Sequence, residues 1–256
     1  MKRLILQKPV KLLLILAGFF VTNALIAEFI GVKIFAFEAT LGLETFNWNL
    51  FGHQGSLMLS AGVLIWPVVF ISTDIINEYF GKRVVKMLSY LTAGLIFYAF
   101  VVIIGSIQLV PADFWVGDYT GRGVPDMQKA YATIFGQGSW IIVASILAFL
   151  VGQVLDAFIF EKFRRVTGEK KIWLRATGST VVSQFFDSFI VLYVAFVLGP
   201  PQWETSLFLA VGTVNYTYKF IVAILLTPLI YLFRRIIDNY LGAELSDKLK
   251  REALGK

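Results

Sequence analysis

Long apolar stretches separated by short polar ones dominate the pattern of hydrophobic and polar positions along the chain. A membrane hydrocarbon core of ~30 Å needs about 20 apolar residues of helix to cross it. Six stretches are long enough, at approximately 10–30, 57–80, 84–110, 139–160, 177–198 and 207–233. Lipid offers the backbone no hydrogen-bond partner, and these stretches are too long for barrel strands. The pattern therefore predicts an all-α, polytopic membrane protein, with six transmembrane helices in one domain over residues 1–256.

Composition and charge support this prediction and add an orientation. Hydrophobic residues make up 57% of the chain and charged residues 16%, whereas soluble domains are about half apolar and a quarter charged. Nineteen of the 23 Lys and Arg residues fall in four segments that lie on one side of the predicted membrane, at 2–11, 82–86, 162–175 and 234–256. By the positive-inside rule both termini are cytoplasmic, in a multi-pass protein of the cell inner (cytoplasmic) membrane. The net charge of +6 then reflects topology and not nucleic-acid binding.

Polar side chains recur inside the apolar stretches. Each ionisable group at membrane depth costs at least about 2.5–3.5 kcal/mol, so such groups indicate function. Asp74 and Glu78 are four residues apart and share one helix face. A second pair, Gln153 and Asp156, has a spacing of three that is repeated further along the chain. We expect these faces to meet inside the bundle at a substrate site, whose candidates are Asn23, Asp74, Asn77, Glu78, Gln153, Asp156, Gln184, Asp187, Asn215 and Lys219.

Structural roles compete with this interpretation at some positions. Asp74 and Glu78 lie toward the predicted cytoplasmic end, where basic residues 82–83 are potential partners. Asp156 has the same alternative with basic residues 164–165. An ion pair with such a partner would make each carboxylate an anchor at the membrane interface.

Asp187 and Lys219 lie near the middle of their spans, beyond the reach of snorkelling to the interface. We expect them to pair with each other, in or beside the substrate site. Asn23 and Asn215 have interhelical hydrogen bonding as an alternative role.

The charge balance of the candidates narrows the class of ligand. Four of their side chains are acids, and Lys219 is the one base set against them near mid-span. Such a site favours a neutral ligand rich in N–H donors, a cation, or transferable protons. A carboxylate suits the adjacent N–H donors of a guanine-type edge, and Trp66, Phe185 and Phe186 offer stacking surfaces. The set is compatible with a purine-like ligand without selecting it, and Pro67 would bend the second span.

Enzyme motifs are missing from the sequence. It contains no cysteine, no HExxH and no GxSxG, and its one histidine, His53, falls in a predicted outer loop. We therefore expect no enzyme, no metal site and no cofactor, although Asp156 and Asp187 leave intramembrane peptide hydrolysis as an alternative. The P-loop motif is also missing, so any use of ATP would require a partner protein.

Three motifs together resemble those of the queuosine precursor transporter family, also called the vitamin uptake transporter family. They are Ser72-Thr73-Asp74-Ile75-Ile76-Asn77-Glu78-Tyr79-Phe80-Gly81, Gln153-x-x-Asp156, and Ser183-Gln184-x-x-Asp187-Ser188-x-Ile190. The resemblance covers essentially the whole chain. It implies import of 7-deazaguanines such as preQ0 and preQ1, precursors of the tRNA base queuosine, and a fold similar to the substrate-binding subunits of energy-coupling-factor transporters.

Two functions follow as expectations. The first is an importer of these deazapurines in the lipid bilayer, driven by protonation of an Asp or Glu. A homo-oligomer is compatible with this function. The alternative is a substrate-binding subunit for another vitamin or purine-like solute that needs an ATPase partner. By the resemblance, the motif residues Asp74, Asn77, Glu78, Gln153, Asp156, Gln184 and Asp187 carry the function.

Overall fold

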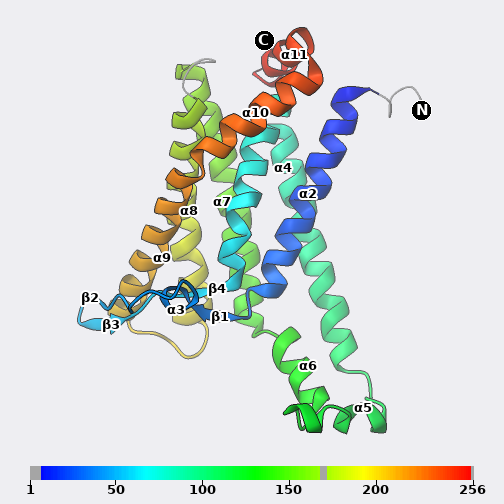
Figure 1. The fold of residues 1–256 in the computed structure, drawn as a ribbon, viewed down its shortest axis with the longest axis vertical. Helices are drawn as coiled ribbons and strands as arrows, with labels where there is room; N and C mark the ends of the chain where they lie inside the picture. Colours follow the sequence, from blue (N-terminus) through cyan, green and yellow to red (C-terminus); the bar gives the residue numbers. More distant parts are fainter. Residues whose placement is uncertain (1–6, 168–171, 255–256) are drawn as a thin grey trace.

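A bundle of long helices makes up most of the computed structural model, which describes residues 7–167 and 172–254. The long helices run side by side along one axis, and short strands lie at one end of the bundle (Figure 1). The long helices are α2 (Lys8–Ile30), α4 (Trp66–Ile107), α7 (Ser139–Thr167), α8 (Ile172–Leu192) and α9 (Thr205–Leu225). Five of the basic residues used to orient the chain lie outside the described residues: Lys2, Arg3, Lys170, Lys171 and Lys256.

The helices carry apolar side chains on their outer surfaces as well as in the core. Leu14, Phe97 and Val143, for example, expose more than half of their surface. Five helical stretches of the described chain are long and apolar enough to cross a membrane: Lys8–Ile30, Trp66–Ile107, Met127–Thr167, Trp173–Leu198 and Thr205–Leu225. Because lipid can cover such surfaces and water cannot do so favourably, the prediction of an all-α polytopic membrane protein is confirmed.

Helix α4 is 42 residues long and combines two stretches that the sequence predicts as separate spans. Its backbone leaves the helical region at Gly81, with φ 78° and ψ 167°. There the chain turns back, and the two halves of α4 run side by side in opposite directions (Figure 1). Positive φ is costly for residues with a Cβ. A Cβ on Gly81 would also lie 3.0 Å from the carbonyl oxygen of Ala253, so glycine suits both the backbone and the space.

The first half of α4 begins later than the sequence suggests. Residues predicted as the start of the second span instead form strand β4 (Met58–Ser60) and the 3₁₀ helix η1 (Ala61–Leu64). Pro67 lies in the first turn of α4, where its missing N–H has no helical partner to lose. The expected bend at Pro67 is therefore wrong, because this proline starts the helix.

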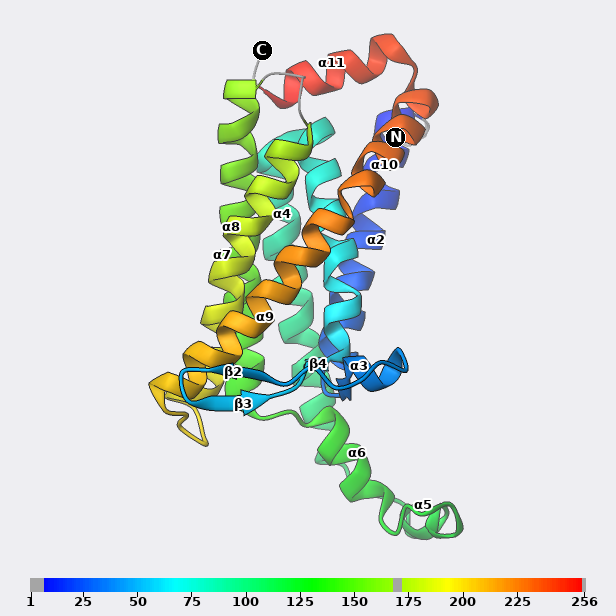
Figure 2. The same cartoon turned by 60° about the vertical axis from the view of Figure 1, so that its left-hand side comes forward.

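The loops at the strand-bearing end are partly ordered into small elements. They are β1 (Ile34–Ala36), α3 (Phe37–Thr40), β2 (Trp48–Leu50), β3 (His53–Gly55), α5 (Asp113–Gly117), η2 (Thr120–Arg122) and α6 (Met127–Phe135). β1 pairs antiparallel with β4, and β2 with β3. Nε2 of His53 lies 2.9 Å from Oγ of Ser206, which fastens the β2–β3 hairpin to the start of α9. Helices α5 and α6 project beyond the bundle (Figure 2).

The remaining elements close the opposite end and shape the interior. After α8 the chain forms a π-helical segment, η3 (Tyr193–Leu198), and after α9 it forms α10 (Thr227–Leu241) and α11 (Ala243–Ala253). Helix α7 packs along α8 and α4, and α2 packs along α4. Helix α9 packs mainly against α8. The space between α9 and the first half of α4 holds a cavity.

Candidate functional site

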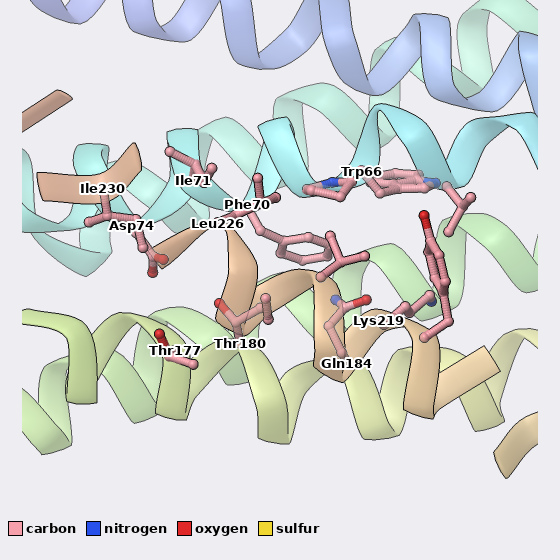
Figure 3. Close-up of a pocket in the computed structure, with 15 residues that line it drawn as sticks. Trp66, Phe70, Ile71, Asp74, Thr177, Thr180, Gln184, Lys219, Leu226 and Ile230 are labelled. Carbon is pink, nitrogen blue, oxygen red and sulfur yellow. The ribbon is translucent and has the colours of Figure 1, made fainter. Parts of the chain in front are cut away.

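The cavity lies between the first half of α4, α8, α9 and the start of α10 (Figure 3). It encloses about 510 Å³ of empty space when its open mouth is included. Trp66 and Phe70 of α4 supply aromatic surface, and Leu226 and Ile230 add aliphatic surface. The walls are thus mostly apolar, as is usual for pockets that bind a small organic molecule.

Helical periodicity places one side chain of each turn toward this cavity. On α4 the lining positions are Pro67, Phe70, Ile71 and Asp74, and on α8 they are Thr177, Thr180 and Gln184. Spacings of three and four put residues on the same helix face. Each helix therefore presents one face to the cavity. On that face the strongly polar residue is Asp74 in α4 and Gln184 in α8.

Asp74 and Gln184 are the polar groups with unused hydrogen-bonding capacity at the cavity. Both are almost fully buried. Within the described part of the chain, Oδ1 of Asp74 and Nε2 of Gln184 have no hydrogen-bond partner. A buried polar atom without a partner costs about 1–3 kcal/mol. An acceptor and a donor held ready in one cavity are therefore typical of a site that pairs with a ligand.

Lys219 of α9 lines the same cavity but already has a partner. Its Nζ donates to Oδ2 of Asp187 on α8 at 2.5 Å. The predicted pairing of these two residues is confirmed. Asp187 does not line the cavity, so its effect there is to neutralise the charge of Lys219.

Gln153 and Asp156 of α7 lie behind the cavity wall and are fully buried. Oε1 of Gln153 accepts from Thr73 at 2.8 Å, and its Nε2 has no partner among the described residues. Oδ1 of Asp156 accepts from Ser183 at 3.2 Å and from Thr180 at 3.4 Å. The repeated Gln-x-x-Asp spacing therefore serves two environments, with Gln184 facing the cavity and Gln153 tying α7 to α4.

The alternative role of Asp156, an ion pair with the basic residues 164–165, is not seen among the described residues, since Asp156 accepts hydrogen bonds from hydroxyl groups instead. Arg165 pairs with Glu161 of its own helix at 2.6 Å. Lys82 of the other expected basic pair also contacts Glu161, at 2.6 Å, and not Asp74 or Glu78.

Glu78 forms the centre of a buried ionic cluster. Its Oε1 accepts from Nη2 of Arg175 at 2.5 Å, and its Oε2 lies 3.6 Å from Nε of Arg164. Arg234 of α10 approaches Oε1 at 3.8 Å. The neighbouring Asn77 donates to the carbonyl oxygen of Ala157 on α7 at 3.2 Å. Asn77 and Glu78 therefore hold helices together at one end of the cavity and do not line it.

Sequence reasoning did not predict this cluster, because Arg175 and Arg234 were counted only as cations outside the spans and Arg164 was considered only as a partner of Asp156. Helical spacing contains a signal for Arg175, since Arg175, Ser179 and Ser183 follow one another at intervals of four. All three are fully buried, and they mark the inner face of α8. Arg164 has no comparable pattern of polar neighbours in the sequence.

Two further candidates lie away from the cavity. Nδ2 of Asn23 donates to the carbonyl oxygen of Phe19 in its own helix at 2.7 Å. Asn215 is half-buried on α9 and is not among the lining residues. Phe185, expected to offer a stacking surface, packs on Tyr216 outside the cavity. Tyr218 lines the cavity and was not predicted.

Apolar helices around a partly polar cavity define the class of protein: an all-α, multi-pass membrane protein. Comparison with protein families then gives the particular group. Residues 60–233 match the family described as "Putative vitamin uptake transporter", and the chain belongs to this family. The expectation of a transporter and not an enzyme is thereby confirmed.

Curated relatives agree with this assignment. The chain is 31% identical over 192 residues to the "Probable queuosine precursor transporter" of Bacillus subtilis (strain 168), covering 75% of this chain and 76% of the relative. It is 24% identical over 196 residues to the "Queuosine precursor transporter" of Escherichia coli (strain K12), covering 75% and 79%. A relative from Haemophilus influenzae is 24% identical over 191 residues, covering 74% and 73%. No solved structure gives a significant match.

Proposed function

We propose that this protein imports queuosine precursors, 7-deazaguanines such as preQ0 and preQ1, across the cell inner membrane. The observation that carries the proposal is the unsatisfied pair of Asp74 and Gln184 in a mostly apolar cavity. A carboxylate accepts two N–H donors side by side, and an amide supplies one donor and one acceptor. A guanine-type edge presents adjacent N–H donors beside a carbonyl oxygen, so it complements both groups.

Aromatic surface supports the same ligand class. Trp66 and Phe70 line the cavity on the α4 side, and Tyr218 lines it on α9. Flat heterocycles stack on such rings for about 1–3 kcal/mol per base. Because Asp187 neutralises Lys219, the described residues that line the cavity offer no unpaired cation to attract an anionic solute. A neutral or cationic heterocycle therefore suits it better than a phosphorylated nucleotide.

The proposed topology has six crossings: α2, the two halves of α4, α7, α8, and α9 with the start of α10. The described chain begins and ends at the same end of the bundle (Figures 1 and 2), which fits an even number of crossings. Gly81, where α4 reverses, lies beside Ala253 of α11, and α11 lies at that same end (Figure 1). Lys82 and Arg83 follow Gly81 directly in the sequence. The positive-inside rule makes this end cytoplasmic.

Uptake of labelled preQ1 by cells that cannot synthesise it tests the proposal. Asp74→Asn and Gln184→Ala each remove one cavity group, and each is expected to weaken binding about ten- to hundredfold, because a hydrogen bond to a charged or buried group contributes about 1.5–3 kcal/mol. Glu161→Gln is the matched control, since Glu161 pairs with Lys82 and Arg165 away from the cavity. Normal uptake by an Asp74→Asn, Gln184→Ala double variant would refute the site.

Purified protein in proteoliposomes separates this function from the alternative of a binding subunit. Accumulation of preQ1 driven by a proton gradient, with no other protein present, is expected of a self-sufficient importer. Binding without accumulation would instead indicate that an ATPase partner is required.

A further inference from the structure

Two buried carboxyl groups near the cavity have no ion pair with a basic side chain in the described part of the chain. They belong to Asp74 of α4 and Asp156 of α7, which are 3% and 0% exposed. The nearby cations are engaged elsewhere, because Arg175 is bonded to Glu78 and Lys219 to Asp187. Thr180 lies between the two carboxyl groups, because it lines the cavity together with Asp74 and its hydroxyl donates to Oδ1 of Asp156.

Each of these carboxyl groups keeps one oxygen without a partner. Oδ1 of Asp74 and Oδ2 of Asp156 have no hydrogen bond to any described residue. Two neighbouring buried carboxylates are very unfavourable when both are ionised, and such pairs share one proton. A proton on either group removes one negative charge and converts one unsatisfied acceptor into a donor.

We propose that Asp74 and Asp156 together hold one exchangeable proton, and that Asp156 keeps this proton while substrate occupies Asp74. The second part rests on the proposed function, since it needs a substrate whose N–H groups donate to Asp74. Such a substrate requires Asp74 to be ionised, so the proton leaves the Asp74 carboxyl oxygen and binds a carboxyl oxygen of Asp156. No other bond forms or breaks.

The geometry gives the two groups different roles. Asp74 lines the cavity and Asp156 does not. Thr180 connects them, because it lines the cavity and its hydroxyl donates to Oδ1 of Asp156 at 3.4 Å. Asp74 is therefore placed to contact substrate, and Asp156 to store the proton one layer behind it.

A proton fits this site better than a metal ion. Asp156 is fully buried and lies outside the cavity. Its Oδ1 already receives two hydroxyl groups, from Ser183 and Thr180, whose hydrogens point toward the oxygen that a cation would need. A proton requires neither space nor a shell of oxygen ligands.

Charged side chains on the neighbouring helices determine the electrostatic potential at Asp74 and Asp156. They are Glu28 on α2, Glu78 on α4, Arg164 on α7, Arg175 and Asp187 on α8, Lys219 on α9 and Arg234 on α10. Glu78 is compensated by arginine and Asp187 by lysine. Glu28 is also buried and has no ion pair among the described residues, but it does not line the cavity. Asp74 and Asp156 are therefore the uncompensated carboxyl groups that Thr180 connects.

Infrared spectroscopy of the purified full chain tests the proton directly and needs no substrate. We expect a protonated-carboxyl band in the folded protein that is lost as the pH is raised. Asp156→Asn should remove or shift this band, and the control Glu161→Gln should leave it unchanged. A band identical in Asp156→Asn, or no titrating band, would overturn the proposal.

Binding of preQ1 as a function of pH tests the division of roles. The affinity of the native protein should rise with pH as the pair loses protons and Asp74 becomes ionised. Asp156→Asn makes residue 156 permanently neutral and removes the charge repulsion, so this variant should bind preQ1 and its rise should move to lower pH. Asp74→Asn should lose binding. Equal affinity of the native protein at every pH would contradict the shared proton.

A second variant covers the case in which Asp156→Asn does not fold. Ser183→Ala removes a hydroxyl donor from Asp156 and so disfavours its ionised form. Asp156 should then hold the shared proton more firmly and leave Asp74 ionised, which should move the rise in binding to lower pH. A shift to higher pH would contradict the assignment of the proton to Asp156. If the infrared band depends on Asp156 but preQ1 does not bind, the proposed function fails and the shared proton stands. If preQ1 binds without any dependence on pH, the shared proton fails alone.

Discussion

Nζ of Lys219 lies 2.5 Å from Oδ2 of Asp187 and joins α9 to α8 beside the cavity. Both side chains are mostly buried, at 17% and 18% exposed. Lys219 is the one basic residue among the described residues that line the cavity. The ion pair therefore fixes α9, which packs mainly against α8, and removes a positive charge from the binding surface.

Breaking this pair from one side should destabilise the protein more than removing both partners. Lys219→Met or Asp187→Asn leaves one buried charge uncompensated, which costs about 3–5 kcal/mol in comparable pairs. The double variant buries no unpaired charge, so its loss should be smaller than the sum of the single losses. Melting temperatures of the purified variants in one detergent measure this coupling. Additive losses would show that the two charges do not depend on each other.

Replacement of Gly81 by alanine should destabilise the reversal of α4. The backbone there has φ 78°, which costs an L-residue roughly 1–2 kcal/mol, and the added Cβ would press on the backbone of Ala253 in α11. Gly94→Ala is the matched control, because it lies in the same helix with no atom within 4 Å of the new Cβ. The control should be neutral or stabilising by about 0.5–1 kcal/mol. Melting temperature and protease cleavage of α11 measure both, and equal stability of the two variants would contradict the role of Gly81.

Docking of α11 should weaken in acid through Asp238. Burial tends to raise the pKa of Asp238, but hydrogen bonds from Lys250, Ser246 and Tyr79 outweigh burial and lower it. A carboxyl with a lowered pKa stabilises the folded state above its ordinary pKa of 3.8. That contribution is lost as the pH falls through the lower, folded-state pKa.

Protease cleavage of α11 as a function of pH measures this effect. Cleavage by an acid-active protease should increase below about pH 4 in the native protein. Asp238→Asn should be cleaved more readily at neutral pH and should show little further change in acid. Native protein whose cleavage does not change between neutral and acid pH would refute the role of Asp238.

Much of the architecture follows from the order of residues alone. Apolar stretches of about 20 residues can satisfy their backbone only as helices in lipid, so the all-α membrane class was predictable. The pairing of Asp187 with Lys219 was predictable for a similar reason, since each charge needs a partner at that depth. Asp74 and Gln184 were among the predicted site residues, and they line the cavity.

Which polar groups face the cavity was decided by the packing of the helices. Two Gln-x-x-Asp motifs read the same in the sequence, yet Gln184 faces the cavity and Gln153 bonds to Thr73. Glu78 lies one helical turn from Asp74, but arginines from other helices surround it. Periodicity fixes the face of each helix on which a residue lies. The rotation and approach of neighbouring helices depend on contacts between residues far apart in the chain, so only the tertiary structure separates the groups that can meet a ligand from those that hold the helices together.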